Sequence, residues 1–321
     1  MELTYKSSKQ ENEVTQKYSD RRVIVTPPQQ KGKQALLRVD LLDSYREFFG
    51  LKEIPFTISP NPKFFYFSRS HAEALNHIRY GIYEGLGFTM ITGEPGTGKT
   101  ILSRYFLSKA GDDLLITKIS DPRFSQKELL LALLENLGIS GITQQDLSQR
   151  KLTQRLCDLL LSSYQKSKKV VLFLDEAQGM DSESLEGIRL LSNLETENHK
   201  LIQIVLLGQR ELEEKLSEEN LRQFDQRILV RYNLFPLELD EIQPYVEHQL
   251  KIAKAPSVEF SVQAINKIYE ITRGLPRMIN VLCERAMMSS FIENKKTIDV
   301  KNVLEGWDSL NGIKILEKTR L

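Results

Sequence analysis

The residues of this sequence best suited to chemistry form a glycine-rich turn in its first third. The turn reads Gly93, Glu94, Pro95, Gly96, Thr97, Gly98, Lys99 and Thr100, and Ile101 follows it. Its spacing matches the pattern G-x-x-x-x-G-K-[ST] of phosphate-binding loops. Glycine has no Cβ atom, so successive backbone N–H groups can turn inward around phosphate oxygens. We expect Lys99 to reach the β- and γ-phosphates of ATP and the Thr100 hydroxyl to ligate Mg²⁺.

The residues on either side of the turn predict the strand and the helix that position it. An apolar run at 88–92 precedes the turn, and a helix-like run at 101–107 follows it. A strand, a glycine loop and a helix in this order are the structural context in which the motif indicates a phosphate-binding loop. The N-terminal end of the helix adds a partial positive charge beneath a bound anion. The sequence therefore predicts a nucleotide site that residues 93–101 contact.

Two adjacent carboxylates follow another apolar run. Residues 170–174 are apolar without alternation, which is typical of a parallel strand buried on both faces, and Asp175 and Glu176 come next. Ligand sites of such sheets lie beyond the carboxyl ends of the strands. We predict that Asp175 holds Mg²⁺, directly or through water, and that Glu176 orients and deprotonates the attacking water. A strand that ends in acids by chance is the alternative, but the loop upstream favours ATP hydrolysis.

Two further residues are candidates for contact near the γ-phosphate. Gln209 follows the apolar run 202–207 and would hydrogen-bond the attacking water if this strand lies beside 170–174; a surface amide is the alternative. Arg277 follows a Gly-Leu-Pro turn at a predicted helix N-terminus, where a cation is unfavourable against the helix dipole. An anionic partner, the γ-phosphate, would explain an arginine there.

Arginines precede the last predicted strand, at 232–237. An arginine just before such a strand is well placed to project from one subunit into a neighbour's nucleotide site. There it would stabilise charge on the transferring phosphoryl group. Arg227 is the first candidate and Arg231 the second. A plain surface arginine is the alternative, because a sequence cannot show a subunit contact.

Aromatic residues offer two candidate contacts for the adenine ring. Phe49 lies in an aromatic cluster that precedes the first helix, and Tyr245 lies near the start of the C-terminal helices. Flat apolar contact on both faces suits an adenine ring. Each residue either lines the base site or packs in a core, and both interpretations stay open.

The apolar runs predict an α/β domain followed by helices. Five parallel strands are expected at 88–92, 114–119, 170–174, 202–207 and 232–237, with helices between them. Four further helices are expected at 240–253, 261–272, 276–293 and 299–310, the last capped by Asp299. The predicted organisation is a flexible arm at 1–40, a nucleotide-binding α/β domain at 41–238, an all-helical lid at 239–312 and a tail at 313–321.

Composition narrows the class of protein. The 321 residues carry a net charge of +1, so the overall charge gives no reason to expect nucleic acid as a partner. A local basic patch remains an alternative. Two cysteines rule out a disulfide framework and fit a reducing compartment. No apolar run approaches the roughly 20 residues of a membrane span, and the N-terminus is not a signal peptide. We therefore expect a cytoplasmic protein.

Taken together, these residues resemble the AAA+ ATPases, and within them the ExeA/GspA-like branch, the ATPases of general secretion. The resemblance covers residues 44–310. It rests on the phosphate-binding loop, on Asp175-Glu176-Ala177-Gln178, on the stretches 190–196 and 203–209, and on Gly274-Leu275-Pro276-Arg277. Members of the branch typically continue into a membrane span and a peptidoglycan-binding region. Because this sequence stops at Leu321 and carries the extra arm, we expect a weaker direct role in building a secretion pore.

The resemblance implies a role for each candidate residue. It implies a P-loop fold of the AAA+ (ASCE) type that uses ATP and Mg²⁺. Lys99 and Thr100 correspond to Walker A, Asp175 and Glu176 to Walker B, and Gln209 to a sensor-1-like position. Arg277 corresponds to sensor 2 and Arg227 to a finger that acts in trans. Members work as rings or filaments with nucleotides at subunit boundaries.

Three functions remain open at this point. The first is a secretion- or pilus-type assembly ATPase that works with a membrane component, which would place the protein at the periphery of the inner membrane. The second is a regulator of transposition of the TnsC-like or MuB-like kind, bound to double-stranded DNA and a transposase. The third is a scaffold that binds ATP, hydrolyses it slowly and acts through assembly.

Overall fold

The computed structural model describes residues 43–120, 124–142, 147–255 and 257–310. The described residues from Tyr45 onwards form one compact unit. The predicted arm at 1–40 and tail at 313–321 lie outside the described residues. Within the described ranges, every helix is too short or too polar to cross a membrane.

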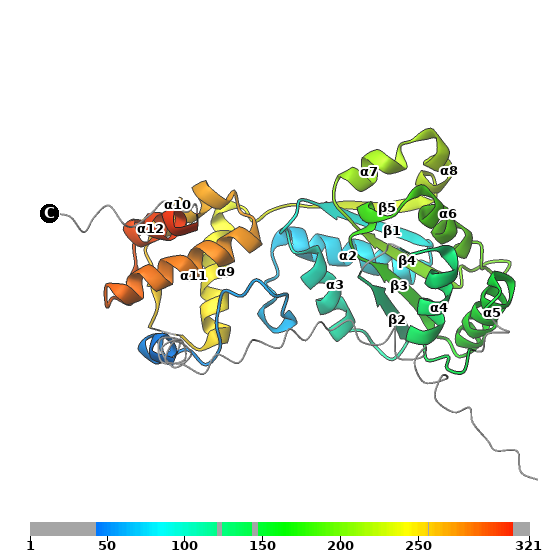
Figure 1. Ribbon diagram of the computed structural model, residues 1–321, viewed down its shortest axis with the longest axis horizontal. Helices are drawn as coiled ribbons and strands as arrows, with labels where there is room; N and C mark the ends of the chain where they lie inside the picture. Colours follow the sequence, from blue (N-terminus) through cyan, green and yellow to red (C-terminus); the bar gives the residue numbers. More distant parts are fainter. Residues whose placement is uncertain (1–42, 121–123, 143–146, 256, 311–321) are drawn as a thin grey trace, which may run out of the picture. The chain divides into compact units, whose positions relative to one another are not determined.

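A parallel sheet forms the centre of the nucleotide-binding domain (Figure 1). Its strands are β1 (Phe88–Gly93), β2 (Leu114–Ile119), β3 (Lys169–Leu174), β4 (Ile202–Leu207) and β5 (Ile228–Leu234). They lie in the order β2-β3-β4-β1-β5, and every neighbouring pair is parallel. The predicted five-stranded parallel sheet is therefore confirmed. Because parallel strands end at one edge, the loop after β1 and the acids after β3 share that edge.

The fifth strand begins at Ile228, before the start at residue 232 that the sequence predicted. Ile228 and Val230 are buried, whereas Leu229 and Arg231 are exposed, so the strand alternates as a half-buried edge strand does. Among the described strands it pairs with β1 alone, and it ends before Pro236, which has no N–H group for a ladder. Arg231 consequently lies inside the strand rather than ahead of it.

Helices cover both faces of the sheet (Figure 1). They are α2 (Arg69–Tyr83), α3 (Lys99–Ser108), α4 (Gln126–Asn136), α5 (Gln149–Gln165), α6 (Ser182–Leu191), α7 (Glu211–Leu216) and α8 (Arg222–Asp225). Short 3₁₀ turns lie at Pro62–Phe64, Ala177–Gly179 and Glu219–Leu221. On β3, Leu172 and Leu174 pack in the cluster formed with α4, α5 and α6, whereas Val171 and Phe173 pack in the cluster formed with α2 and α3. The sheet is thus buried on both faces, which explains its continuous apolar runs.

Side-chain caps set the start of several helices. Ser68 caps α2 by accepting from the His71 N–H group. Ser125 caps α4 in a capping box with Glu128. Such caps satisfy N–H groups that the helix itself leaves without a partner, and each contributes about 1 kcal/mol. The α2 cap also brings His71 to a fixed place beneath the loop after β1.

The C-terminal helices form the lid domain. They are α9 (Leu239–Ala253), α10 (Val262–Thr272), α11 (Pro276–Ile292) and α12 (Val300–Leu310). Asn302 N–H donates to Asp299 Oδ1 over 3.1 Å, so the predicted cap by Asp299 is confirmed. The all-helical lid is corrected in one respect, because β6 (Glu259–Phe260) pairs in parallel with β7 (Thr297–Ile298). This short pair joins the segments before α10 and α12.

The N-terminal part of the described chain packs with the lid rather than with the sheet. Residues 43–49 are helical, and Tyr45 and Phe49 are fully buried in the lid core, in contact with Phe291. Lys52 N–H then donates to the Ala253 carbonyl over 3.0 Å. The predicted domain start at residue 41 lies outside the described residues. Within them, the apolar side chains before α2 are buried against the helices of the lid.

Candidate nucleotide site

The glycine loop, residues 93–100, has a backbone that suits glycine at two positions. Gly96 and Gly98 have φ values of +89° and +106°, in a region that residues with a Cβ rarely adopt. A Cβ on Gly98 would also lie 2.7 Å from Nε2 of His71, which is buried beneath the loop. Helix α3 begins at Lys99, directly after the loop. This geometry fits a phosphate group held by backbone N–H groups at a helix N-terminus.

The Lys99 ammonium lies folded against the glycine loop. Its Nζ donates to the carbonyls of Gly93, over 2.8 Å, and Glu94, over 3.0 Å. Burial lowers the pKa of Lys99, and the nearby carboxylates of Glu176 and Asp175 oppose that shift. An ammonium held only by carbonyls can exchange them for phosphate oxygens, so the side chain fits the triphosphate contact.

The two carboxylates after β3 differ in surroundings. Asp175 is 3% exposed, and its Oδ2 lies 2.8 Å from Nζ of Lys118. Glu176 is exposed and has φ +54° and ψ +36°, a left-handed conformation that costs a non-glycine residue about 1 kcal/mol or more. Its Oε2 accepts from Nε2 of Gln178 over 2.7 Å and from Nε2 of Gln209 over 3.4 Å. The unusual backbone therefore directs Glu176 towards Gln209 rather than into the sheet.

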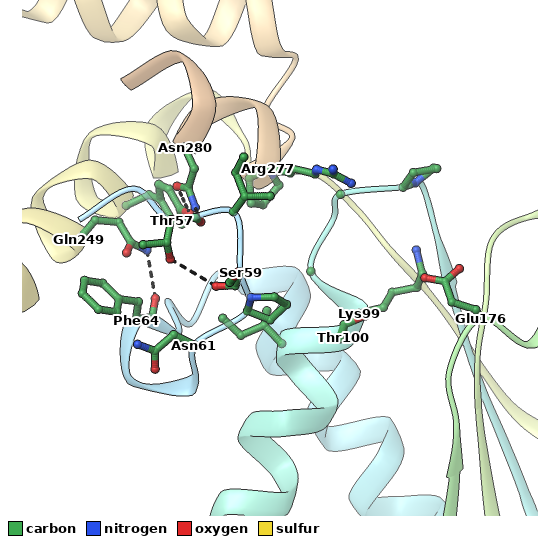
Figure 2. Close-up of a pocket in the computed structure, with 18 of the residues that line it drawn as sticks. Thr57, Ser59, Asn61, Phe64, Lys99, Thr100, Glu176, Gln249, Arg277 and Asn280 are labelled. Carbon is green, nitrogen blue, oxygen red and sulfur yellow. Dashed lines mark hydrogen bonds between the residues drawn. The ribbon is translucent and has the colours of Figure 1, made fainter. Parts of the chain in front are cut away.

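A cavity of about 490 Å³ brings most of the predicted residues together (Figure 2). The predicted residues that line it are Pro95, Gly96, Gly98, Lys99, Thr100, Ile101, Glu176, Gln209, Tyr245 and Arg277. Gly93, Glu94 and Thr97 shape the loop without lining the cavity, and Thr97 braces it by donating its Oγ1 proton to the Glu94 carbonyl over 2.8 Å. Asp175 precedes the lining residue Glu176 and does not itself line the cavity. The volume falls in the range of small-ligand pockets.

A segment before α2, residues 57–61, closes one side of the cavity, and we call it the strap. Two lid side chains hold the strap and the 3₁₀ turn that follows it (Figure 2). Nδ2 of Asn280 donates to the Thr57 carbonyl over 2.9 Å, and Nε2 of Gln249 donates to the Phe64 carbonyl over 3.0 Å. Arg104 of α3 donates to the Pro60 carbonyl over 2.7 Å. The strap is thus attached to both the lid and the helix that follows the glycine loop.

Sequence reasoning missed the strap, Gln249 and Asn280. A helical-periodicity signal could have found the two lid residues. Gln249 lies four residues after Tyr245, and Asn280 lies three residues after Arg277, so each shares a helix face with a predicted residue. The Tyr245 hydroxyl donates to Oδ1 of Asn280 over 2.7 Å, and burial raises the pKa of Tyr245. Tyr245 thus lines the cavity and packs at the same time.

Arg277 joins the lid to the glycine loop. Its backbone N–H donates to the Gly96 carbonyl over 3.3 Å, and a Cβ on Gly96 would lie 3.1 Å from Cβ of Arg277. Pro276 occupies the first turn of α11, where its missing N–H group is not needed. Figure 2 shows the Arg277 side chain extending from the lid helix towards the loop. The guanidinium is exposed at the cavity, where it can meet an anion.

The structure places Phe49 outside the cavity. Phe49 is fully buried, and its ring centroid lies 5.2 Å from that of Tyr45 and 4.7 Å from that of Phe48. Phe49 therefore packs in a core, which was the alternative interpretation, and does not line the cavity as a contact for adenine. The physical reason is that the helix at 43–49 turns its aromatic face into the lid core, away from the strap.

The two candidate finger arginines also lie outside the cavity lining. Nη1 of Arg227 donates to Oγ of Ser192 over 2.8 Å and to Oδ1 of Asn193 over 2.6 Å, just after α6. Arg231 forms an ion pair with Asp225 over 2.8 Å. A contact with a neighbouring subunit remains a prediction for Arg227. Arg231 has its own carboxylate partner, which makes it the weaker candidate.

Comparisons with known proteins agree with this geometry. A family model described as an AAA domain matches residues 82–216. General secretion pathway protein A of Aeromonas hydrophila is 39% identical over 254 residues, which cover 79% of this chain and 46% of that protein. Residues 82–216 therefore carry an AAA domain. Over the matched residues the chain is similar to the ExeA/GspA-like branch of the AAA+ ATPases, as its motifs predicted, and it spans less than half the length of that relative.

Solved structures share the fold at low identity. The ORC2 protein of Aeropyrum pernix, in ADPNP-ADP complexes, has a TM-score of 0.60 at 17% identity and covers 84% of this chain and 72% of its own. A RuvB variant of Thermotoga maritima has a TM-score of 0.51 at 17% identity, with coverage of 75% and 68%. At such identities the likeness shows the fold alone. It confirms the predicted α/β P-loop architecture.

A buried histidine supports the glycine loop. Nδ1 of His71 lies 2.6 Å from Oγ of Ser68, and the ring packs beneath Gly98. Burial lowers the pKa of His71 to about 4, below its ordinary value of 6.5. Between these two pH values the unfolded chain binds a proton that the folded chain does not. The contribution of His71 to the free energy of unfolding is therefore fully present above pH 6.5, and it is lost as the pH falls towards the pKa of the folded state.

We expect the free energy of unfolding to fall by about 2 kcal/mol between about pH 7 and pH 5 through His71 alone. Urea denaturation at both pH values measures the change. His71→Gln should flatten this dependence, whereas His199→Gln, at an exposed histidine, should leave it as in the wild type. Equal pH dependence in wild type and His71→Gln would contradict the assignment. His248, whose pKa burial also lowers, supplies a remaining slope in every variant.

Proposed function

We propose that this AAA+ chain binds ATP with Mg²⁺ in the cavity and hydrolyses it. The observation that carries the proposal is the meeting of three groups in one cavity: the Lys99 loop, the Glu176–Gln209 pair and Arg277 of the lid. Each group has the chemistry for a different part of the reaction. The remaining lining, from the strap and the lid, is left for the nucleoside.

The residues divide the reaction between them. Lys99 exchanges its contacts with the loop carbonyls for contacts with the β- and γ-phosphates. Backbone N–H groups of the loop hold the remaining phosphate oxygens of ATP. Thr100 and Asp175 are oxygen donors of the kind that Mg²⁺ prefers, and when bound the ion neutralises charge on the phosphate oxygens. Glu176 accepts the proton of the attacking water, and Gln209 orients the same water. Arg277 stabilises charge on the γ-phosphate.

The hydrogen bond between Gln209 and Glu176 supports the assignment of the water site. The two side chains come from the ends of adjacent strands, β4 and β3, and their 3.4 Å contact supports the proposal that one water is held by both. A general base must lie within hydrogen-bond reach of the proton that it removes. A water in the cavity beside Glu176 would satisfy this condition for both residues.

We further infer that the chain works as an oligomer, a ring or filament with nucleotide at subunit boundaries. Its likeness to General secretion pathway protein A supports an assembly ATPase of the secretion or pilus type that acts with a membrane component, in the cytoplasm beside the inner membrane. Arg227 is the proposed trans contact. It lies after the short α8 and before the edge strand β5, where a neighbouring copy has access.

A mixing experiment tests hydrolysis at subunit boundaries. Arg227→Ala should lower turnover about tenfold or more, since a phosphoryl-transfer site without its arginine loses stabilisation of the transition state. Lys99→Ala subunits should be inactive alone. Mixing the two variants should restore part of the turnover, because some boundaries then combine an intact Lys99 with a neighbour's intact Arg227. Turnover and the assembled mass, with a non-hydrolysable ATP analogue and with ADP, are the measurements.

The control is Arg222→Ala, at an exposed arginine of α8. It should keep wild-type turnover. Thermal unfolding of each variant separates a trans role from the contacts that Arg227 makes with Ser192 and Asn193 in its own chain. Absence of recovery in the mixture, with all variants folded, would refute the trans assignment. Strong stimulation of turnover by double-stranded DNA, with a steep salt dependence, would favour the transposition-type function instead.

A further inference from the structure

A largely buried lysine that the sequence did not single out lies against the carboxylate assigned to the metal. Nζ of Lys118 is 2.8 Å from Oδ2 of Asp175, and the two side chains are only 11% and 4% exposed. Lys118 lies on β2, whose neighbour in the sheet is β3, the strand that leads into Asp175. The register pairs Lys118 with Phe173, which places the lysine one strand away from the acid.

The same ammonium is anchored to the helix that follows the glycine loop. Nζ of Lys118 donates to Oγ of Ser103 over 2.6 Å, and Oγ of Ser103 donates to the Thr100 carbonyl over 2.9 Å. Ser103 is fully buried. Lys118 therefore connects the elements that carry both proposed metal ligands, Thr100 and Asp175. Its position is fixed from two sides before any ligand binds.

The two oxygens of Asp175 have different partners. Oδ1 accepts from the Glu176 N–H group over 3.2 Å, and Oδ2 faces Lys118. The Asp175 N–H group itself donates to the Ile119 carbonyl over 2.9 Å, which continues the ladder between β3 and β2. The carboxylate is thus held in one orientation, with a cation at the oxygen that faces β2. A divalent ion at this carboxylate must share it with a fixed positive charge.

We propose that Lys118 is a positioning residue that holds Asp175 ready for the metal and sets the Mg²⁺ concentration that the site requires. The inference rests on the proposed function, because it assigns Asp175 to Mg²⁺ bound with ATP. In the metal-free protein the ammonium compensates the buried carboxylate, which would otherwise be costly to bury. When Mg²⁺ binds, the same ammonium repels it and weakens its attraction to Asp175. Lys118 therefore lowers the affinity of the site for the metal but keeps the Asp175 carboxylate in its binding orientation.

Metal affinity measured at a fixed nucleotide state tests the proposal. Binding of Mn²⁺, followed by electron paramagnetic resonance with a non-hydrolysable ATP analogue present, should be roughly tenfold tighter in Lys118→Met than in the wild type. Lys118→Gln, which keeps a hydrogen-bond donor for Asp175 but no charge, should shift in the same direction. Lys118→Arg should stay near the wild type. The Mg²⁺ concentration for half-maximal turnover should fall in parallel.

The controls separate this effect from a general loss of structure. Lys127→Met removes the same charge at an exposed position of α4 and should change nothing. In an Asp175→Asn background, Lys118→Met should leave Mn²⁺ affinity unchanged, because the carboxylate through which it acts is gone. The double variant also buries no unpaired charge, so it remains folded if Lys118→Met alone does not.

Two outcomes overturn the inference. One is unchanged or weaker Mn²⁺ binding in both Lys118→Met and Lys118→Gln while nucleotide affinity stays at the wild-type value. The other is a shift of equal size in the Asp175→Asn background, which would mean that Lys118 does not act through Asp175. Failure of the proposed function is recognised separately: the wild-type chain itself would then bind no ATP analogue in the presence of Mg²⁺ or Mn²⁺.

Discussion

Replacing Lys99 with alanine should remove nucleotide binding almost completely. The ammonium is the one cation of the glycine loop, and it lies buried, where it donates to the carbonyls of Gly93 and Glu94. Alanine removes a charge-assisted contact to two phosphates, the strongest kind of hydrogen bond available there. We expect the affinity for ATP to fall roughly 100-fold or more. Titration with a fluorescent ATP analogue measures it directly.

A lysine at the end of the same helix provides the control for Lys99→Ala. Lys109 is exposed at the C-terminal end of α3, so Lys109→Ala removes one positive charge without touching the cavity. Its affinity for ATP should match that of the wild type. Thermal unfolding without nucleotide should show that Lys99→Ala remains folded. Wild-type affinity in a folded Lys99→Ala protein would exclude the glycine loop as the phosphate site.

Much of this site was predictable because its signals are local in the sequence. The glycine loop is a contiguous motif, and β1, β3 and β4 are continuous apolar runs because both faces of the sheet are covered. The acids after β3 follow directly from the end of a buried strand. Fold and loop therefore required no knowledge of which residues meet in space.

The edge strand shows where local signals weaken. Leu229 is 67% exposed and Arg231 points away from the core, so the first part of β5 resembles a charged loop in the sequence. Only pairing with β1 makes it a strand. A similar ambiguity affects Phe49, because an aromatic cluster predicts burial without saying which surface buries it. Phe49 is buried by the lid core, and most residues of that core come from the far end of the chain.

Polar contacts between residues that are distant in the sequence were not predictable from local signals. Asn280 acts on the strap, Gln249 acts on the 3₁₀ turn that follows it, and Lys118 acts on Asp175, through contacts that exist only in the folded chain. A lysine within a short strand normally indicates an exposed face. Here its ammonium is buried because Asp175 and Ser103 compensate it.

Replacing Glu176 with glutamine should separate nucleotide binding from hydrolysis. Glutamine keeps the size of the side chain and can still hydrogen-bond Gln178 and Gln209, so the left-handed backbone at this position is preserved. The amide cannot accept the proton of the attacking water. We expect kcat to fall by about 10²- to 10⁴-fold, the usual contribution of a general base, while affinity for ATP remains within a few-fold of the wild type. Turnover and analogue titration measure the two quantities.

The consequence for assembly follows from the same chemistry. If oligomers form with ATP at subunit boundaries and come apart after hydrolysis, Glu176→Gln should accumulate the assembled state in ATP, with the mass that the wild type shows in a non-hydrolysable analogue. Glu183→Gln, at an exposed glutamate in the first turn of α6, should behave as the wild type in every assay. Full turnover in Glu176→Gln would remove this residue as the base and assign the proton to another acceptor. A turnover loss without a trapped assembly would instead separate hydrolysis from disassembly, and the chain would be a motor rather than a nucleotide-gated scaffold.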